Sequence, residues 1–210
     1  MSSTPIFLGI AGASASGKSL LAHTLYHELQ YELGESAISI IKEDSYYRKV
    51  YDLSLEEREQ INYDHPNAFD HDLLLEQMDM LAKNQTIEVP VYDYKNHNRS
   101  DQTTTHFPSK VVIVEGILLL NDKQIRKRMD VKVFMDTDLD ICLLRRLKRD
   151  VEERGRTMDS IIEQYKRTVR PMFLEFVQPS KQYADIIVPR GGKNRVVIEM
   201  LKARIKQMLD

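Results

Sequence analysis

The chain lacks several features that mark large classes of protein. It has no tryptophan and a single cysteine, Cys142, so no disulfide can form within the chain. A lone cysteine suits a reducing compartment and is usually a small buried side chain. No segment reaches the ~20 consecutive apolar residues of a membrane-spanning helix, and residues 1–5 lack the basic and apolar stretches of a secretion signal. We therefore expect a cytoplasmic protein with no membrane partner.

Neither sign of charge is in large excess, since the net charge is −2 and the sequence pI is about 6.3. Domains that bind nucleic acid are usually strongly basic, so we expect no nucleic-acid partner. The basic residues are nevertheless unevenly spread. A cluster of them is usually a solvated helix face, unless an anion site lies opposite. The cluster lies at 145–156 and comprises Arg145, Arg146, Lys148, Arg149, Arg154 and Arg156.

Short apolar runs alternate with stretches of helical periodicity along the 210 residues. This alternation predicts one α/β domain, 1–210, with a parallel sheet covered by helices on both faces. Asp138 and Asp159 are candidate caps for two of the helices, and Pro171 is expected to bend the second. We expect strands at 6–10, 37–41, 111–114, 131–135 and 185–188, and helices at 18–33, 72–82, 138–153, 159–176 and 194–208.

A small β insertion interrupts this alternation at about 86–108. Residues 87–91 and 103–107 have strand character, and we expect a long polar loop between them. Residues 48–70, which precede the insertion, are polar and rich in turn-forming side chains.

The first strand leads directly into a phosphate-binding motif, G-x-x-x-x-G-K-[ST]. Small residues allow the backbone N–H groups to surround phosphate oxygens, and the following helix directs its positive end at the same anion. The lysine reaches the β- and γ-phosphates, and the final hydroxyl binds Mg²⁺. The motif residues are Gly12, Ala13, Ser14, Ala15, Ser16, Gly17, Lys18 and Ser19.

A phosphate loop alone does not separate kinases from GTPases, motors or nucleotide sensors. The chain has no Asn-Lys-x-Asp motif, and no Asp-x-x-Gly motif directly after a strong strand, which argues against a GTPase. Two acids instead follow predicted strands. Asp44 is either an exposed turn residue or a base that accepts a proton and faces the metal. Glu115 ends the most apolar strand, where a carboxylate is costly unless it is paired or close to a metal ion.

The arginine cluster then has a candidate partner in the bound phosphates. Arg154 and Arg156 flank Gly155, and guanidinium groups on a mobile segment can close over transferring phosphates. We therefore expect a lid at about 150–160, while Arg145 and Lys148 are expected on the solvated face of a helix.

Taken together, these segments resemble the uridine/cytidine kinase family of the bacterial type, over nearly the whole chain. The phosphate loop is shared widely among kinases, whereas the tyrosine- and histidine-containing segments are more particular to this family. The segments that carry the resemblance are 12–19, 43–47, 62–66, 90–94, 97–99, 115–117, 145–150, 153–156 and 189–191.

The resemblance implies a nucleoside monophosphate kinase-like P-loop core with a β hairpin over the acceptor site. It implies that Asp44 is the base on the ribose 5′-hydroxyl and that Ser19, Glu115 and Asp44 serve Mg²⁺. Lys18, Arg149, Arg154 and Arg156 would act on the phosphates, and Arg156 would also face the acceptor. For the remaining acceptor contacts it implies Asp64, Arg146 and Gln164 at the ribose, Tyr92 and His97 at the pyrimidine edge, and Tyr63 and Tyr94 against the ring.

The implied reaction transfers the γ-phosphate of ATP or GTP to the 5′-hydroxyl of uridine or cytidine. The resemblance also implies a homotetramer that responds to UTP or CTP. Two alternatives stay open: another small-molecule kinase, similar to phosphoribulokinase or pantothenate kinase, and a nucleotide sensor that transfers nothing. A sugar phosphate would call for an arginine-rich acceptor pocket, and a sensor is expected to lack one or more transfer groups.

Overall fold

Residues 4–189 and 191–210, which the computed structural model describes, build a five-stranded parallel sheet with the order β2-β5-β1-β6-β7. The predicted α/β fold class is confirmed. Arg190, in the segment 189–191, lies outside the described residues. The strands are β1 (Ile6–Gly12), β2 (Ile38–Lys42), β5 (Val111–Gly116), β6 (Val131–Asp136) and β7 (Ile186–Pro189).

The central strand β1 is buried along its whole length, and its side chains alternate between two apolar clusters. Phe7 and Ala11 belong to the cluster on one face of the sheet, whereas Leu8 and Ile10 belong to the cluster on the other. This two-sided burial explains why the strand has a continuous apolar sequence in place of alternation.

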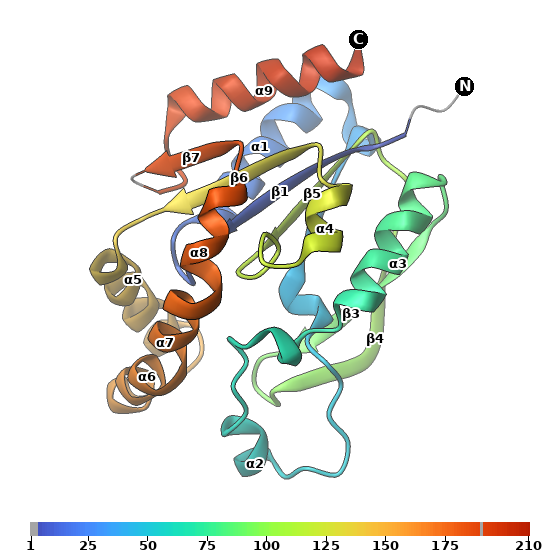
Figure 1. The fold of residues 1–210 in the computed structure, drawn as a ribbon. Helices are drawn as coiled ribbons and strands as arrows, with labels where there is room; N and C mark the ends of the chain where they lie inside the picture. Colours follow the sequence, from blue (N-terminus) through green and yellow to red (C-terminus); the bar gives the residue numbers. More distant parts are fainter. Residues whose placement is uncertain (1–3, 190) are drawn as a thin grey trace.

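Helices cover both faces of the sheet (Figure 1). The helices α1 (Lys18–Leu33) and α9 (Arg195–Leu209) pack together on one face. On the opposite face lie α3 (His71–Ala82) and α4 (Lys123–Arg128). Leu20, which falls on the apolar spacing of α1, is 45% exposed and does not join the core.

The start of β1 is held by close contacts with the segment that precedes β6. Gly9 packs so closely against Met129 that an added Cβ atom would lie 2.1 Å from the methionine sulfur. The neighbouring Asp130 accepts a 2.8 Å hydrogen bond from the backbone N–H of Phe7. These contacts hold in place the strand that leads into the phosphate loop.

The insertion is an antiparallel hairpin of β3 (Ile87–Asp93) and β4 (Asn98–His106) (Figure 1). The expected long polar loop is wrong, because β4 pairs with β3 from Asn98 onward. Only residues 94–97 connect the strands, and His97 there has a φ of 47°, in the left-handed region.

Two short elements in the polar segment 48–70 were not predicted. The helix α2 (Leu55–Glu59) begins with a capping box, in which Ser54 and Glu57 exchange side-chain and backbone hydrogen bonds. A 3₁₀ turn (Pro66–Ala68) follows it. Neither element buries an apolar side chain, so no hydrophobic periodicity marks them.

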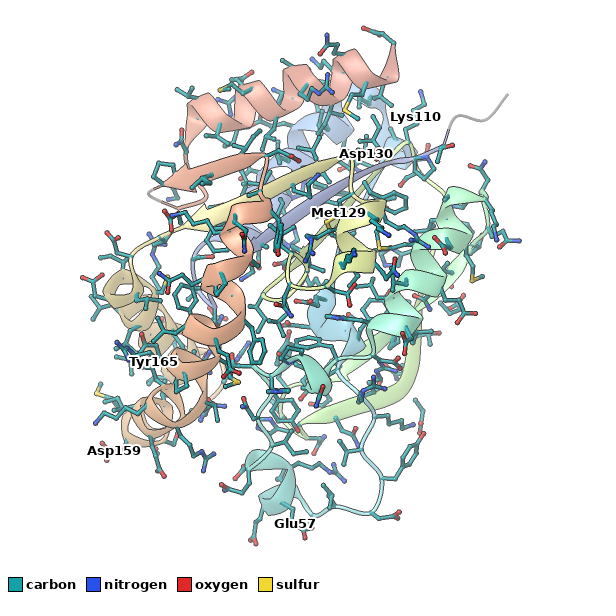
Figure 2. All side chains as sticks on the ribbon, viewed as in Figure 1. Glu57, Lys110, Met129, Asp130, Asp159 and Tyr165 are labelled. Atoms are coloured by element: carbon teal, nitrogen blue, oxygen red, sulfur yellow. The ribbon has the colours of Figure 1, made fainter. Side chains whose placement is uncertain are left out.

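Helix α5 (Leu139–Glu152) begins after Asp138, whose side chain makes no capping hydrogen bond. Asp138 is nevertheless the N-cap position of α5, as expected, whereas the expected cap at Asp159 is wrong, because Thr157 caps the next helix and accepts from the N–H of Ser160. Asp159 lies at the outer end of this region (Figure 2).

The helical run after Thr157 continues to Ser180 and changes its hydrogen-bonding pattern on both sides of Pro171. A π-helical segment lies before this proline and another after it. Pro171 therefore lies within the helical run and does not end it. The segments are α6 (Met158–Gln164), the π-helical Tyr165–Val169, α7 (Arg170–Met172), the π-helical Phe173–Val177 and α8 (Gln178–Ser180). Within residues 4–189 and 191–210, every helix is too short or too polar to span a lipid bilayer.

Candidate active site

A cavity of about 600 Å³ lies where β1, β2 and β5 end, between the hairpin and the helices α5 and α6. It gathers side chains from every part of the predicted site. Those that line it are Ser14, Ala15, Gly17, Lys18, Ser19, Asp44, Tyr63, Asp64, Tyr92, Tyr94, His97, Glu115, Arg146, Arg149, Arg154, Arg156 and Gln164.

The phosphate loop curls at one end of this cavity. Gly17 adopts a φ of 101°, and an added Cβ atom would lie 2.8 Å from the backbone nitrogen of Gly192, so only glycine fits. Lys18 is 93% buried, with 7% of its surface exposed, and its Nζ donates to the carbonyl oxygen of Ala13 at 2.9 Å. The loop therefore presents the first N–H groups of α1 and a lysine to an anion.

Three predicted loop residues, Gly12, Ala13 and Ser16, do not line the cavity. They lie behind the loop and shape it: the N–H of Ser16 donates to Ala13, and the hydroxyl of Thr137 donates to the carbonyl of Ser16 at 2.9 Å. At Gly12 a Cβ atom would lie 2.7 Å from the carbonyl oxygen of Met135.

A buried carboxylate lies beside the phosphate loop. The Ser19 hydroxyl donates to Glu115 at 2.8 Å. Burial raises the pKa of Glu115, and the nearby charge of Lys18 opposes that rise. Lys42 is paired with Glu115 in the sheet register, so Asp44, two residues later, emerges at the same edge of the sheet.

This donor set fits part of a magnesium shell. Within the described residues, no three histidine, cysteine, aspartate or glutamate side chains come together as a metal site. Mg²⁺ is usually held by one or two carboxylates together with substrate phosphates and waters. The oxygen atoms of Ser19, Glu115 and Asp44, all at the cavity wall, suit that arrangement.

Asp44 lies on a 3₁₀ turn (Glu43–Tyr46) that is anchored by its buried neighbour. The carboxylate of Glu43 accepts from the N–H of Leu118 at 2.9 Å and contacts His71 Nε2 at 2.9 Å. Gly116 leaves room for this carboxylate, since a Cβ atom there would lie 2.2 Å from it. The position of Asp44 is therefore set by packing beneath it.

The other end of the cavity is aromatic. Tyr63 and Tyr92 are each 9% exposed, and the Tyr63 hydroxyl donates to the carbonyl of His97 at 2.9 Å. The rings of Tyr63 and His97 stack at 5.6 Å. Burial lowers the pKa of His97, which favours a neutral imidazole that can donate or accept a hydrogen bond at neutral pH. This end of the cavity can bind a flat ring and form hydrogen bonds with its edge.

Arginines close the wall between the two ends. Arg146 donates to Ser14 at 3.0 Å and to Gln164 at 2.9 Å, and Arg156 donates to the same Gln164 oxygen at 2.7 Å. Arg154 lies over the ring of Tyr94 at 4.5 Å. Asp64 lines the same region; burial raises its pKa and Arg146 opposes the rise.

Among the residues in or behind the cavity wall that the sequence did not predict are Tyr47, Arg145 and Asp150. Tyr47 lines the cavity and packs on Tyr63, although only its place three residues after Asp44 hinted at this. Arg145, expected on a solvated face, also lines the cavity and directs its guanidinium at the carbonyl of Ser16 at 3.5 Å. Asp150 lies buried among the arginines, where an acid within a basic cluster was the available signal.

Comparisons with known proteins agree with this geometry. The phosphoribulokinase / uridine kinase family model matches residues 7–197. The uridine kinase of Vibrio vulnificus is 61% identical over 204 residues, covering 97% of this chain and 96% of the relative. The uridine kinase of Vibrio cholerae is 60% identical, with the same coverage of both chains.

Solved structures share the fold at low identity. Phosphoribulokinase from Rhodobacter spheroides has a TM-score of 0.63 at 14% identity, covering 90% of this chain and 71% of that chain. D-glycerate 3-kinase from Cryptococcus neoformans has a TM-score of 0.62 at 20% identity, covering 84% of this chain and 80% of that chain.

Proposed function

This chain belongs to the phosphoribulokinase / uridine kinase family, and we propose that it transfers the γ-phosphate of ATP or GTP to the 5′-hydroxyl of uridine or cytidine. The products are UMP or CMP, so the reaction serves pyrimidine salvage. Relatives named uridine kinase, at about 60% identity over nearly the full length, support the assignment.

The structural observation that carries the proposal is the continuity of the cavity. Its phosphate loop suits a triphosphate, its tyrosine and histidine end suits a pyrimidine, and Asp44 lies between the two. A donor phosphate and an acceptor hydroxyl held in one cavity are already positioned for reaction, which is a large part of catalysis.

Different side chains of the cavity have different roles in the proposed phosphate transfer. Asp44 accepts the proton of the attacking 5′-hydroxyl. Lys18 and the arginines at 149, 154 and 156 stabilise charge on the phosphate as it moves, and closure of the lid excludes water. Asp64, Arg146 and Gln164 hold the ribose hydroxyls, so the 5′-hydroxyl points at the phosphate.

We further propose that Mg²⁺ accompanies the triphosphate, held by Ser19 and Glu115, with Asp44 facing it. When bound, the ion neutralises phosphate charge and fixes the donor's orientation. The hydroxyl–carboxylate contact of 2.8 Å between Ser19 and Glu115 supports this placement.

The acceptor end argues for a pyrimidine. Tyr63 and Tyr92 supply flat, mostly buried surface, and His97 can donate to or accept from the edge of uracil or cytosine according to its tautomer. A purine would need more room. We also propose a homotetramer, feedback inhibition by UTP or CTP, and a cytoplasmic location, each of which rests on the family resemblance alone.

The alternatives predict other acceptors or none. A phosphoribulokinase-like or pantothenate kinase-like enzyme would use an acceptor without a nucleobase, which leaves Tyr63 and Tyr92 without a base to contact. A sensor would not need the full set of Lys18, Ser19, Asp44 and Glu115 around one cavity.

The test is a coupled assay of nucleoside diphosphate release. It contains Mg²⁺, ATP or GTP, and one of five acceptors: uridine, cytidine, adenosine, ribulose 5-phosphate or pantothenate. We expect release with uridine and cytidine alone. Release with a different acceptor would keep the kinase reaction but reject the pyrimidine pocket, and release with none of them would favour the sensor.

A further inference from the structure

The carboxylate of Asp150 is surrounded by arginine side chains. Asp150 lies on α5 and is fully buried, with 0% of its surface exposed. Its oxygens contact Arg149 at 2.8 Å, Arg154 at 3.4 Å, Arg156 at 3.6 Å and Arg146 at 3.7 Å. Its backbone carbonyl also accepts from the N–H of Arg156 at 3.0 Å. One residue therefore contacts the lid through both its side chain and its main chain.

These contacts approach the arginines from behind the cavity. The side chains of Arg149, Arg154 and Arg156 remain 29%, 31% and 25% exposed, and all three line the cavity wall. Asp150 does not line it. The carboxylate therefore leaves the cavity-facing surface of the guanidinium groups available for an anion.

Electrostatics explains why a carboxylate is needed at this point. Arginine cannot lose its proton, so guanidinium groups that converge on one site repel one another. A buried carboxylate among them offsets that repulsion and favours their convergence before any phosphate arrives. The neutral amide of an asparagine of the same shape could not do this.

The contacts with Asp150 do not by themselves lock the arginines in place. Only the Arg149 contact has the length of a hydrogen bond, and the other three are longer ion pairs. Within the described residues, Asp150 Oδ2 and Arg146 Nε are buried polar atoms that make no hydrogen bond. A charged anchor with loose geometry can hold side chains near a position and still allow them to tighten on a ligand.

We propose that Asp150 is a positioning residue that holds the lid arginines in the orientation that phosphate transfer requires. It touches neither donor nor acceptor and acts through Arg149, Arg154 and Arg156. The effect that we predict on turnover when Asp150 is replaced rests on the proposed kinase function. The effect that we predict on the lid segment does not.

The test compares Asp150→Asn with Asp150→Glu and with a matched control, Glu152→Gln. The control also removes one negative charge from α5, at an exposed position. The first readout is amide hydrogen exchange over residues 150–160 without substrates. We expect faster exchange in Asp150→Asn, little change in Asp150→Glu, and none in Glu152→Gln. Unchanged exchange in Asp150→Asn would overturn the positioning role whatever the kinetics show.

The second readout is kinetic, with uridine as acceptor. We expect kcat of Asp150→Asn to fall about 10²-fold, because a misplaced catalytic group has an effect of that size. The Kd of the triphosphate is expected to change less than about threefold, because the phosphate loop is untouched, and Asp150→Glu is expected to recover part of the kcat. Normal kcat with faster exchange, or a loss of triphosphate affinity as large as the loss of kcat, would overturn the link to transfer.

Two controls keep the outcomes distinct. If Asp150→Asn does not fold, Asp150→Glu decides alone: its longer side chain shifts the anchor while keeping the charge, so wild-type kcat would overturn the proposal. If the wild-type protein transfers phosphate to none of the acceptors, the proposed function fails, and the exchange experiment still decides the role of Asp150 in the lid.

Discussion

The hydroxyl group of Tyr94 donates a 2.8 Å hydrogen bond to the carboxylate of Asp44. The same tyrosine ring lies beneath the guanidinium of Arg154, at 4.5 Å. Burial and the charge of Asp44 raise the pKa of Tyr94, so its hydroxyl stays protonated at neutral pH. Tyr94 therefore joins the hairpin to both the proposed base and the proposed lid.

We predict that Tyr94→Phe lowers KM for uridine about fivefold, because the acceptor hydroxyl no longer competes with a hydrogen bond of ~1 kcal/mol. The ring, and with it the contact to Arg154, is retained. Steady-state kinetics against uridine concentration measures this, with Tyr31→Phe, at a 93% exposed tyrosine, as the control. A higher KM would mean that the hydroxyl assists acceptor binding.

Asp44→Asn is expected to reduce kcat about 10²-fold or more, because the amide cannot accept the proton of the attacking hydroxyl. Triphosphate binding should stay nearly intact, which equilibrium titration with a fluorescent nucleotide measures. Asp52→Asn, in an exposed loop, is the matched control. Near-normal turnover in Asp44→Asn would remove this residue from the mechanism.

His97→Ala is expected to raise KM for uridine about tenfold, with little change in donor binding, because a half-buried hydrogen-bond partner of the base is lost. His97 has a φ of 47°, a conformation that alanine adopts poorly. We therefore pair it with His97→Asn, which tolerates that backbone and retains a donor and an acceptor. Unchanged KM in both variants would exclude His97 from base recognition.

For Glu115→Gln we expect the Mg²⁺ concentration at half-maximal rate to rise by about 10- to 100-fold, as when a carboxylate near a metal is neutralised. Without Mg²⁺, the thermal unfolding midpoint should rise or stay level. Burial raises the pKa of Glu115, so folding disfavours the ionised form at neutral pH, and the amide removes that cost. A lower midpoint together with an unchanged Mg²⁺ requirement would contradict both roles.

His71 makes stability depend on pH. Burial lowers the pKa of His71, but its contacts with Glu43 and Asp122 outweigh burial and the opposing Arg48, so the pKa lies above 6.5. The protonated form thus stabilises the fold fully below about pH 6.5, and this stabilisation is lost as pH rises through the raised pKa.

His71→Gln should therefore lower the unfolding midpoint most at about pH 5.5, and the difference from wild type should shrink at about pH 8.5. Thermal unfolding at both pH values measures this. His27→Gln, at an exposed histidine, supplies the control. A difference that grows toward high pH would show that neutral His71 is the stabilising form.

The sequence predicts well those elements that are buried on a regular period. The strands of the sheet and the helix at 18–33 were found because apolar residues mark them. The strand Asn98–His106 was missed over much of its length, since it reads Asn-Arg-Ser-Asp-Gln-Thr-Thr-Thr-His. This strand forms through backbone pairing with β3, and no apolar face marks it in the sequence.

The sequence predicts those parts of the candidate site in which a single motif carries the chemistry. It predicts less of the parts that depend on contacts between side chains. The phosphate loop, Asp44 and Glu115 follow strands and were identified from that position. Asp150 was missed as a part of the site because its burial depends on arginines that lie before and within the proposed lid segment. The cap at Thr157 was missed because Asp159 is an equally good capping residue two positions later.

The two π-helical segments around Pro171 make chain length as important as side-chain identity in this region. Each wide turn holds one more residue than an α-helical turn. Gln164, which bridges two site arginines, precedes the first segment, and Val177, which packs beneath the sheet, ends the second. Deleting one residue between them would rotate everything beyond by about 100° relative to the site. This stretch is therefore expected to accept substitutions far more readily than a change in its number of residues.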